Sequence, residues 1–158
     1  MKKIFEKLRN IKISNKSGIF KPHKYALILA IAKAYSINPN RTNQFFLVEL
    51  EQLFKEAVKT LDPFFDLDKA FIEYPFYHLQ SDGVLELKIK AGKEREFLEI
   101  FNSASQRFTR RRLIELVDYA ILCEDFAQAL KNEGQRIEFC LEIERIFLMK
   151  SKRIGINA

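Results

Sequence analysis

The sequence predicts a mainly α-helical domain with one small β-hairpin, in a winged-helix-like arrangement. Its length of 158 residues suits a single domain with one hydrophobic core. Apolar residues recur at helical spacing in most segments, and a composition with 47% hydrophobic residues, five Gly and four Pro is typical of an ordered globular chain. No repeat or linker-like tract divides residues 1–158, so we expect one domain.

The first part of the chain is predicted to fold around one buried helix. A basic helix is expected over about 2–10, followed by a polar turn at 14–18. Pro22 then precedes the run 25–35, which is apolar nearly all round and therefore predicts a central buried helix.

The middle of the chain carries the predicted β-structure. Residues 44–47 could form a strand, and 48–61 have the periodicity of an amphipathic helix. Two β-prone runs, 74–79 and 84–89, flank the turn signal Gln80-Ser81-Asp82-Gly83 and together predict a hairpin.

The last third is predicted to be helical. Apolar residues within 113–121 follow an i, i+3, i+4, i+7, i+8 pattern, and a final helix is expected over about 135–149. Cys123 and Cys140 fall in these segments and are interpreted as small buried hydrophobes rather than a disulfide framework. The fifteen Phe residues are assigned to the core by default.

Two observations favour a cytoplasmic protein without a membrane span. The basic N-terminus is not followed by the apolar segment of a signal peptide. The longest apolar stretch, residues 25–32, is far shorter than the roughly 20 residues that cross a bilayer.

Positive charge is concentrated in a few places. Residues 1–24 hold eight Lys or Arg and a single Glu, a net charge of +7 in a chain whose total formal charge is +6. Two smaller basic groups follow: Arg107 with Arg110, Arg111 and Arg112, and Lys150 with Lys152 and Arg153. Localised positive charge predicts a polyanionic partner such as DNA, although a solvated surface is the alternative.

The three consecutive arginines have a second unusual feature. If Thr109 caps a helix, residues 110–112 occupy its first turn, where the helix dipole disfavours positive charge. A bound phosphate would reverse that cost and is the explanation we favour, whereas weak salt bridges to Glu115 and Asp118 are the alternative.

Candidate catalytic and metal-binding residues are few. The only histidines are His23 and His78, and together with the two cysteines they lack the ligand spacing of a zinc site. Nucleotide-binding and hydrolase motifs are missing from the sequence, so no cofactor is predicted.

One pattern keeps a nuclease open as an alternative. Glu86 and Lys88 share a face of the predicted strand, and with the upstream Asp62-Pro63 they are similar to a PD-(D/E)xK arrangement, in which carboxylates hold Mg²⁺. The alternation of apolar and charged residues over 85–90 is better explained by a half-buried strand.

Two motifs resemble a known family. Residues 21–29, Lys-Pro-His-Lys-Tyr-Ala-Leu-Ile-Leu, and residues 73–83, Glu-Tyr-Pro-Phe-Tyr-His-Leu-Gln-Ser-Asp-Gly, are similar to the sulfur-binding domain of phosphorothioate-dependent type IV restriction endonucleases. The likeness covers about residues 15–149. It implies binding to DNA in which sulfur replaces a non-bridging phosphate oxygen, with any nuclease in another domain or subunit.

The resemblance also implies roles for individual residues. His23 and Lys24 match a His-Arg/Lys pair that approaches the modified phosphate. Tyr74 and Pro75 match the residues whose ring edges form the sulfur pocket, and His78 matches a further pocket position. Two departures are Tyr25, where relatives often have Pro, and His78, where some have a smaller residue.

The chemistry of this pocket is physically reasonable. Sulfur is larger and less well hydrated than oxygen, so an apolar rim accepts it at a lower desolvation cost, while Lys24 would supply a counter-charge. We therefore expect the chain to recognise phosphorothioate DNA without chemistry of its own. The alternatives are the Glu86–Lys88 nuclease and a winged-helix regulator that binds unmodified DNA or a protein.

Overall fold

One almost completely buried helix lies at the centre of the protein. The structure, a computed structural model, describes the backbone of residues 1–13 and 20–157 and the side chains of 1–13 and 20–152. Helix α2, His23–Ile37, begins directly after Pro22, and every residue from His23 to Ala32 is buried. Its apolar character on all sides is explained by neighbours on all sides, and the predicted central helix is confirmed.

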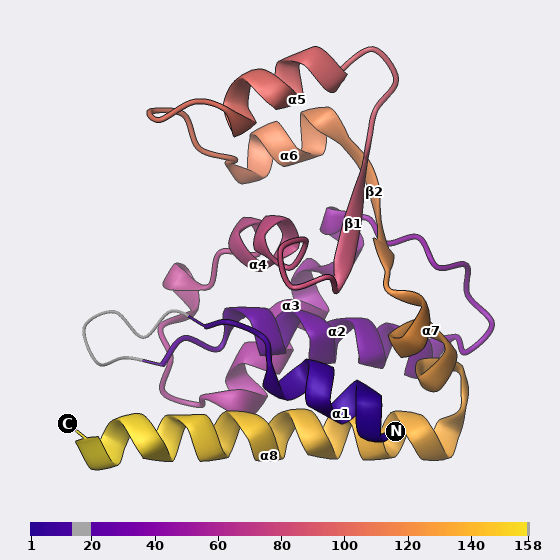
Figure 1. The fold of residues 1–158 in the computed structure, drawn as a ribbon, viewed down its shortest axis with the longest axis vertical. Helices are drawn as coiled ribbons and strands as arrows, with labels where there is room; N and C mark the ends of the chain where they lie inside the picture. The colour runs from indigo at the N-terminus through magenta and orange to yellow at the C-terminus, as the bar shows by residue number, and fades with distance from the viewer. Residues whose placement is uncertain (14–19, 158) are drawn as a thin grey trace.

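Other helices surround α2 (Figure 1). They are α1 Lys2–Arg9, α3 Leu47–Leu61, α4 Glu73–His78, α7 Glu124–Lys131 and α8 Glu133–Asn157, with a short 3-10 turn, η2, over Leu67–Lys69. Helices α3, α4, α7 and α8 all contact α2, and α8 runs along the opposite side of α2 from α4. The expected helices at 2–10, 48–61 and 135–149 are therefore confirmed. Among the helices described, none is both long and apolar enough to span a bilayer.

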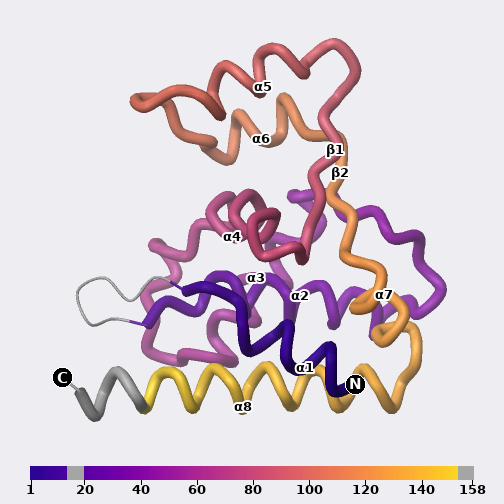
Figure 2. Tube along the Cα trace, in the orientation of Figure 1, coloured from indigo at the N-terminus to yellow at the C-terminus, as the bar shows by residue number. Residues whose placement is uncertain are grey.

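A two-stranded antiparallel ribbon carries two helices away from this body. Strands β1 Leu85–Ile89 and β2 Val117–Leu122 pair with Leu85 opposite Leu122 and Leu87 opposite Ala120. Helices α5 Glu94–Phe101 and α6 Arg110–Leu116 join the far ends of the strands and lie above the body in Figures 1 and 2. We call these two helices and their connecting loop, residues 94–116, the lobe.

The mainly helical class with a small β-hairpin is confirmed, but the predicted location of the hairpin is wrong. Residues 74–79 form helix α4 instead of a strand, because Pro75 lies in the first turn, where no backbone N–H needs an intrahelical acceptor. Asp82-Gly83 is a turn as expected, with Gly83 at φ 70°, but it joins a helix to a strand. The winged-helix-like arrangement stays a prediction.

The second strand lies where a helix was expected. Helix α6 ends at Leu116, and residues 117–122 pair with β1, so the predicted continuous helix over 113–121 is wrong. Val, Tyr and Ile in this run favour an extended chain. The expected strand at 44–47 is reduced to one bridge between Phe45 and Ala120, and Cys123 precedes α7 rather than lying in a helix.

A buried ion pair ties three segments of the body together. The Lys24 ammonium lies 2.7 Å from Asp82 Oδ2, and the two side chains are only 8% and 5% exposed. Lys24 Nζ also donates to the carbonyl oxygen of Lys12, and the Lys12 N–H donates to Asp82 Oδ1. The segment after α1, the start of α2 and the turn after α4 are thereby fixed to one another.

We expect Asp82→Asn to destabilise the protein by about 3–5 kcal/mol, because it leaves the Lys24 ammonium buried without a counter-ion. Urea unfolding of Asp82→Asn, Lys24→Met and the double variant measures this. The double variant should lose less stability than the sum of the two single variants, since it removes both charges.

The matched control is the exposed ion pair between Lys88 and Glu86. Lys88→Met should change the free energy of unfolding by less than about 1 kcal/mol. A loss for Asp82→Asn as small as that of the control would contradict the structural role of the buried pair.

Candidate nucleic-acid interface

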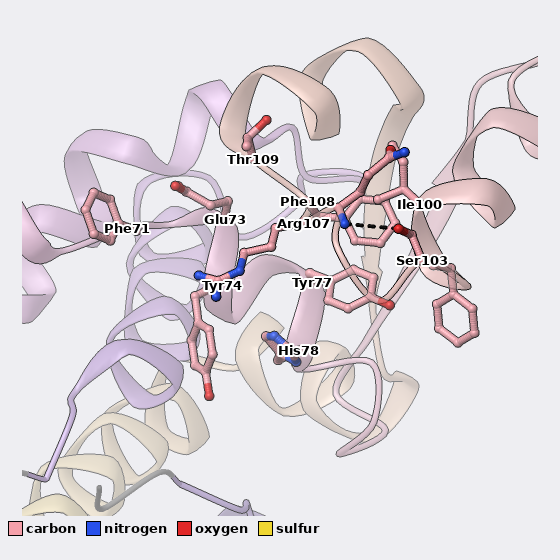
Figure 3. A pocket seen from close by; sticks show the side chains of 12 residues that line it. Phe71, Glu73, Tyr74, Tyr77, His78, Ile100, Ser103, Arg107, Phe108 and Thr109 are labelled. Carbon is pink, nitrogen blue, oxygen red and sulfur yellow. Dashed lines mark hydrogen bonds between the residues drawn. The ribbon is translucent and has the colours of Figure 1, made fainter. Parts of the chain in front are cut away.

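A cleft of about 540 Å³ separates α4 from the lobe. Its walls combine aromatic rings, polar side chains and one arginine: Phe71, Glu73, Tyr74, Tyr77, His78, Ile100, Phe101, Ser103, Gln106, Arg107, Phe108 and Thr109. Figure 3 shows these side chains converging from the two sides of the cleft. Two sequence regions about thirty residues apart thus form one concave surface.

Three packed aromatic rings join the lobe to the body, and two of them, Tyr77 and Phe108, line the cleft. Tyr77 of α4 stacks on Phe108 with ring centroids 4.4 Å apart, and Phe108 packs on Phe97 of α5 at 4.6 Å. Burial raises the pKa of Tyr77, so its hydroxyl stays protonated at physiological pH. These contacts hold the lobe against α4 and set the width of the cleft.

Tyr74 and His78 form the rim on the α4 side. They are four residues apart on one helix, so their rings meet with centroids 4.4 Å apart. Burial is the main cause that lowers the pKa of His78, and the positive charge of Lys24 lowers it further, partly offset by Asp82. The rim is therefore uncharged at neutral pH and presents mainly ring surface.

His23 supports the Tyr74 ring from below. It is buried at the start of α2, and its ring lies edge-on to Tyr74 with centroids 5.9 Å apart. His23 Nε2 donates a hydrogen bond to the Lys69 carbonyl oxygen at 3.0 Å, while Nδ1 has no hydrogen-bond partner in the described part of the chain. Burial lowers the pKa of His23, which keeps the ring neutral.

Two of the residues taken from the family motifs are placed differently from expectation. Lys24 is buried, and its charge is neutralised by Asp82 in the turn that follows α4. Its ammonium group therefore fixes this turn and does not face the cleft. Pro75 is also buried in the first turn of α4 and does not line the cleft.

Tyr25, noted as a departure from the family pattern, lies away from the cleft. Its hydroxyl donates to the Leu8 carbonyl oxygen at 2.6 Å and accepts a hydrogen bond from Lys150 Nζ at 2.7 Å. Burial raises the pKa of Tyr25 far above its usual range, so the hydroxyl stays protonated and donates. Tyr25 therefore joins α2 to α1 and α8.

Arg107 is the cation of the cleft. It is exposed, and in Figure 3 its side chain runs across the cleft toward Tyr74. Within residues 1–13 and 20–152, no carboxylate lies within ion-pairing distance of its guanidinium. This arginine can accept an anion without giving up an existing partner.

The other three arginines of this group are already paired. Thr109 caps α6 as predicted, its hydroxyl accepting from the Arg112 N–H at 3.2 Å. Each guanidinium then meets a glutamate: Arg110 with Glu51, Arg111 with Glu115, and Arg112 with Glu96. All three side chains are accessible to solvent. These ion pairs offset the unfavourable helix dipole. Only Glu115 was expected as a partner, and among the described residues Asp118 pairs with none of the three arginines.

The remaining basic residues serve several purposes. Lys150 Nζ donates to the carbonyl oxygens of Arg9 and Ile11 and therefore anchors the N-terminal segment. Lys152 is exposed. Lys16, the turn at 14–18 and the Arg153 side chain lie outside the described residues.

The pair considered for a nuclease forms a local ion pair. Lys88 Nζ lies 3.1 Å from Glu86 Oε1 on the exposed face of β1, and Leu85 and Leu87 face the core. In the part of the chain that the structure describes, no group of three or more His, Cys, Asp or Glu side chains is placed to hold a metal ion. Strand alternation accounts for both residues.

Sequence reasoning missed the residues that complete the cleft. Phe108 was assigned to the core with the other Phe residues, Tyr77 was placed in a predicted strand without a role in the site, and the lobe was not anticipated. No local signal could have paired them, because their contact depends on β1 finding β2 across the lobe.

Comparison with known proteins supports the fold. No protein-family model matches the sequence, and no curated protein matches it either. A similar solved structure is the sulfur-binding domain and SRA domain of ScoMcrA complexed with phosphorothioated DNA, at 15% sequence identity and a TM-score of 0.60. The match covers 87% of this chain and 40% of that one. The chain therefore shares its fold with part of a protein that was solved bound to phosphorothioated DNA.

Proposed function

We propose that this chain binds duplex DNA containing a phosphorothioate, with the modified phosphate held in the cleft between α4 and the lobe. The observation that carries the proposal is the cleft itself, where the uncharged Tyr74–His78 rim faces the unpaired Arg107. The fold shared with a structure solved with phosphorothioated DNA supports the same ligand.

The rim favours sulfur over oxygen through desolvation. A phosphate oxygen placed against the Tyr74 and neutral His78 rings would lose water without gaining a hydrogen bond, which costs about 1–3 kcal/mol and more for a charged group. Sulfur is larger, more polarisable and less strongly hydrated, so its transfer to the same surface costs less. Selectivity follows from this difference, and both modified and ordinary DNA would still use the same charge contacts.

Arg107 takes the counter-charge role that we expected of Lys24 from the sequence. A phosphorothioate keeps its negative charge, and the remaining oxygen can accept from the guanidinium. Lys24 contributes indirectly, because its ion pair with Asp82 fixes the turn that follows His78. His23 likewise acts by supporting the Tyr74 ring, whereas Pro75 is buried in the first turn of α4.

Neighbouring backbone phosphates would be met by the surrounding basic residues. Arg110, Arg111 and Arg112 are accessible at one edge of the lobe, and a DNA phosphate there would compete with their glutamate partners. Each of these arginines must give up its glutamate partner before it can bind a phosphate. We therefore expect each of them to contribute less to the DNA-binding free energy than Arg107 does.

We assign no catalytic step to this chain. The role proposed is that of a binding module in a modification-dependent restriction system, with cleavage performed by another domain or subunit. The similar solved structure supports a binding role, since it holds a sulfur-binding domain and an SRA domain complexed with phosphorothioated DNA.

Tyr74→Ala should reduce selectivity for phosphorothioate DNA by about tenfold to a hundredfold, because it removes the apolar rim. Paired titrations use one duplex with and without a single phosphorothioate of defined stereochemistry, at a stated salt concentration. Phe64→Ala, at an exposed aromatic residue outside the cleft, should leave selectivity unchanged. Equal losses on both duplexes for Tyr74→Ala would exclude the sulfur pocket.

Arg107→Gln should weaken binding to modified and unmodified duplexes alike and reduce the slope of log affinity against log salt by about one unit. Arg95→Gln is the control, since Arg95 is an exposed lobe residue outside the cleft. Arg110→Gln should change the slope by less than Arg107→Gln. An unchanged slope in Arg107→Gln would remove this residue from the interface.

A further inference from the structure

Helix α8 has two apolar faces, and only one of them is used by the body. Phe139, Ile143, Ile146 and Phe147 are buried against the rest of the protein. On the outward face, Ile137 is 55%, Leu141 61% and Leu148 55% exposed, and Met149 is exposed beside them. The outer face of a surface helix is ordinarily polar, so this stripe indicates a binding surface.

The stripe follows the helix and is interrupted at its middle by two charged residues. Ile137, Leu141 and Leu148 stand at positions i, i+4 and i+11, the spacing of a helix-pairing seam, and span about 16 Å. Glu144 and Arg145 lie between Leu141 and Leu148 on the same exposed face. An occupant must therefore cover leucines at both ends and match a carboxylate and a guanidinium in the middle.

We propose that the occupant is a second copy of this chain, with the two α8 helices packed antiparallel about a two-fold axis between Glu144 and Arg145. In this register Leu141 faces Leu148 of the second copy, and Glu144 faces Arg145 of the second copy. The same contacts occur twice, as in any isologous dimer.

Charge complementarity favours a second copy of this chain as the partner and an antiparallel arrangement of the two α8 helices. Arg145 uses Nε and Nη2 for Glu142 of its own helix, whereas Nη1 contacts only Met149 Sδ, a weak acceptor. Glu144 has no ion pair within the described residues. In the antiparallel pair, the Glu144 carboxylate of the second copy can therefore accept a hydrogen bond from Arg145 Nη1. A parallel pair would instead place like charges together, with Glu144 against Glu144 and Arg145 against Arg145.

The area of the α8 interface determines how stable a dimer we expect. A single helix pair of about four turns falls at or below the roughly 1,200 Å² at which stable interfaces begin. The pair should therefore be a reversible dimer with a dissociation constant in the micromolar range, visible in sedimentation velocity across a concentration series.

Cysteine cross-linking tests the direction and the register. In a Cys123→Ser, Cys140→Ser background, Leu141→Cys combined with Leu148→Cys should oxidise to a covalent dimer at least tenfold faster than either single variant. The two new thiols cannot bond within one helix, because their Cα atoms are about 10 Å apart. A rapid dimer from Leu141→Cys alone, or none from the combined variant, would overturn the antiparallel pair.

Sedimentation of matched leucine variants tests the surface. Leu148→Gln should weaken the dimer at least tenfold, because each substitution acts twice across the two-fold axis. Leu98→Gln is the control, since Leu98 on α5 is 54% exposed but lies outside the stripe. Circular dichroism checks that both variants fold. A monomer at every concentration up to about millimolar, or equal effects of the two variants, would refute the proposal.

Discussion

Lys24 and Asp82 form their ion pair where water is excluded, so each charge depends on the other for its solvation. Removing two ions from water is costly, and only close approach with additional hydrogen bonds offsets that cost. The pair meets this condition by drawing in the Lys12 backbone, whose carbonyl accepts from Lys24 and whose N–H donates to Asp82. The turn after α4 can consequently occupy one position only, and Tyr74 and His78 are held in place just before it.

A second lysine also connects segments of the body, at the other side of α2. Lys150 donates to two carbonyl oxygens and to the Tyr25 hydroxyl, so it ties α8 to the segment after α1. Part of the basic excess of this chain therefore organises its interior and is unavailable to a polyanion. Arg107 differs because it is exposed and unpaired in the described chain, so net charge alone is a poor guide to which cations meet a ligand.

Several features that depend on residues close together in the sequence were predicted correctly, and features that depend on residues far apart in the sequence were not. Helices α2 and α8 were predictable because their apolar residues recur within one element, and Thr109 was predictable as a cap because capping is local. The ribbon was not, since the partner of β1 lies beyond two intervening helices and its apolar residues also fit a helical pattern. Tyr74, His78 and Arg107 line the cleft, and their role in DNA binding stays a prediction, whereas the burial of Lys24 and Pro75 depends on tertiary packing.

The arrangement of the cleft and α8 determines whether DNA binding and pairing can coexist. The cleft lies between α4 and the lobe, while α8 runs along the opposite side of α2 (Figure 1). A pair formed through the outward face of α8 would leave both clefts uncovered and pointing away from the two-fold axis. Two modified sites on one DNA molecule could then be bound by one dimer, and the second contact would benefit from the high effective concentration set by the first. A reversible dimer is sufficient for this effect, because the DNA itself would hold the two copies together.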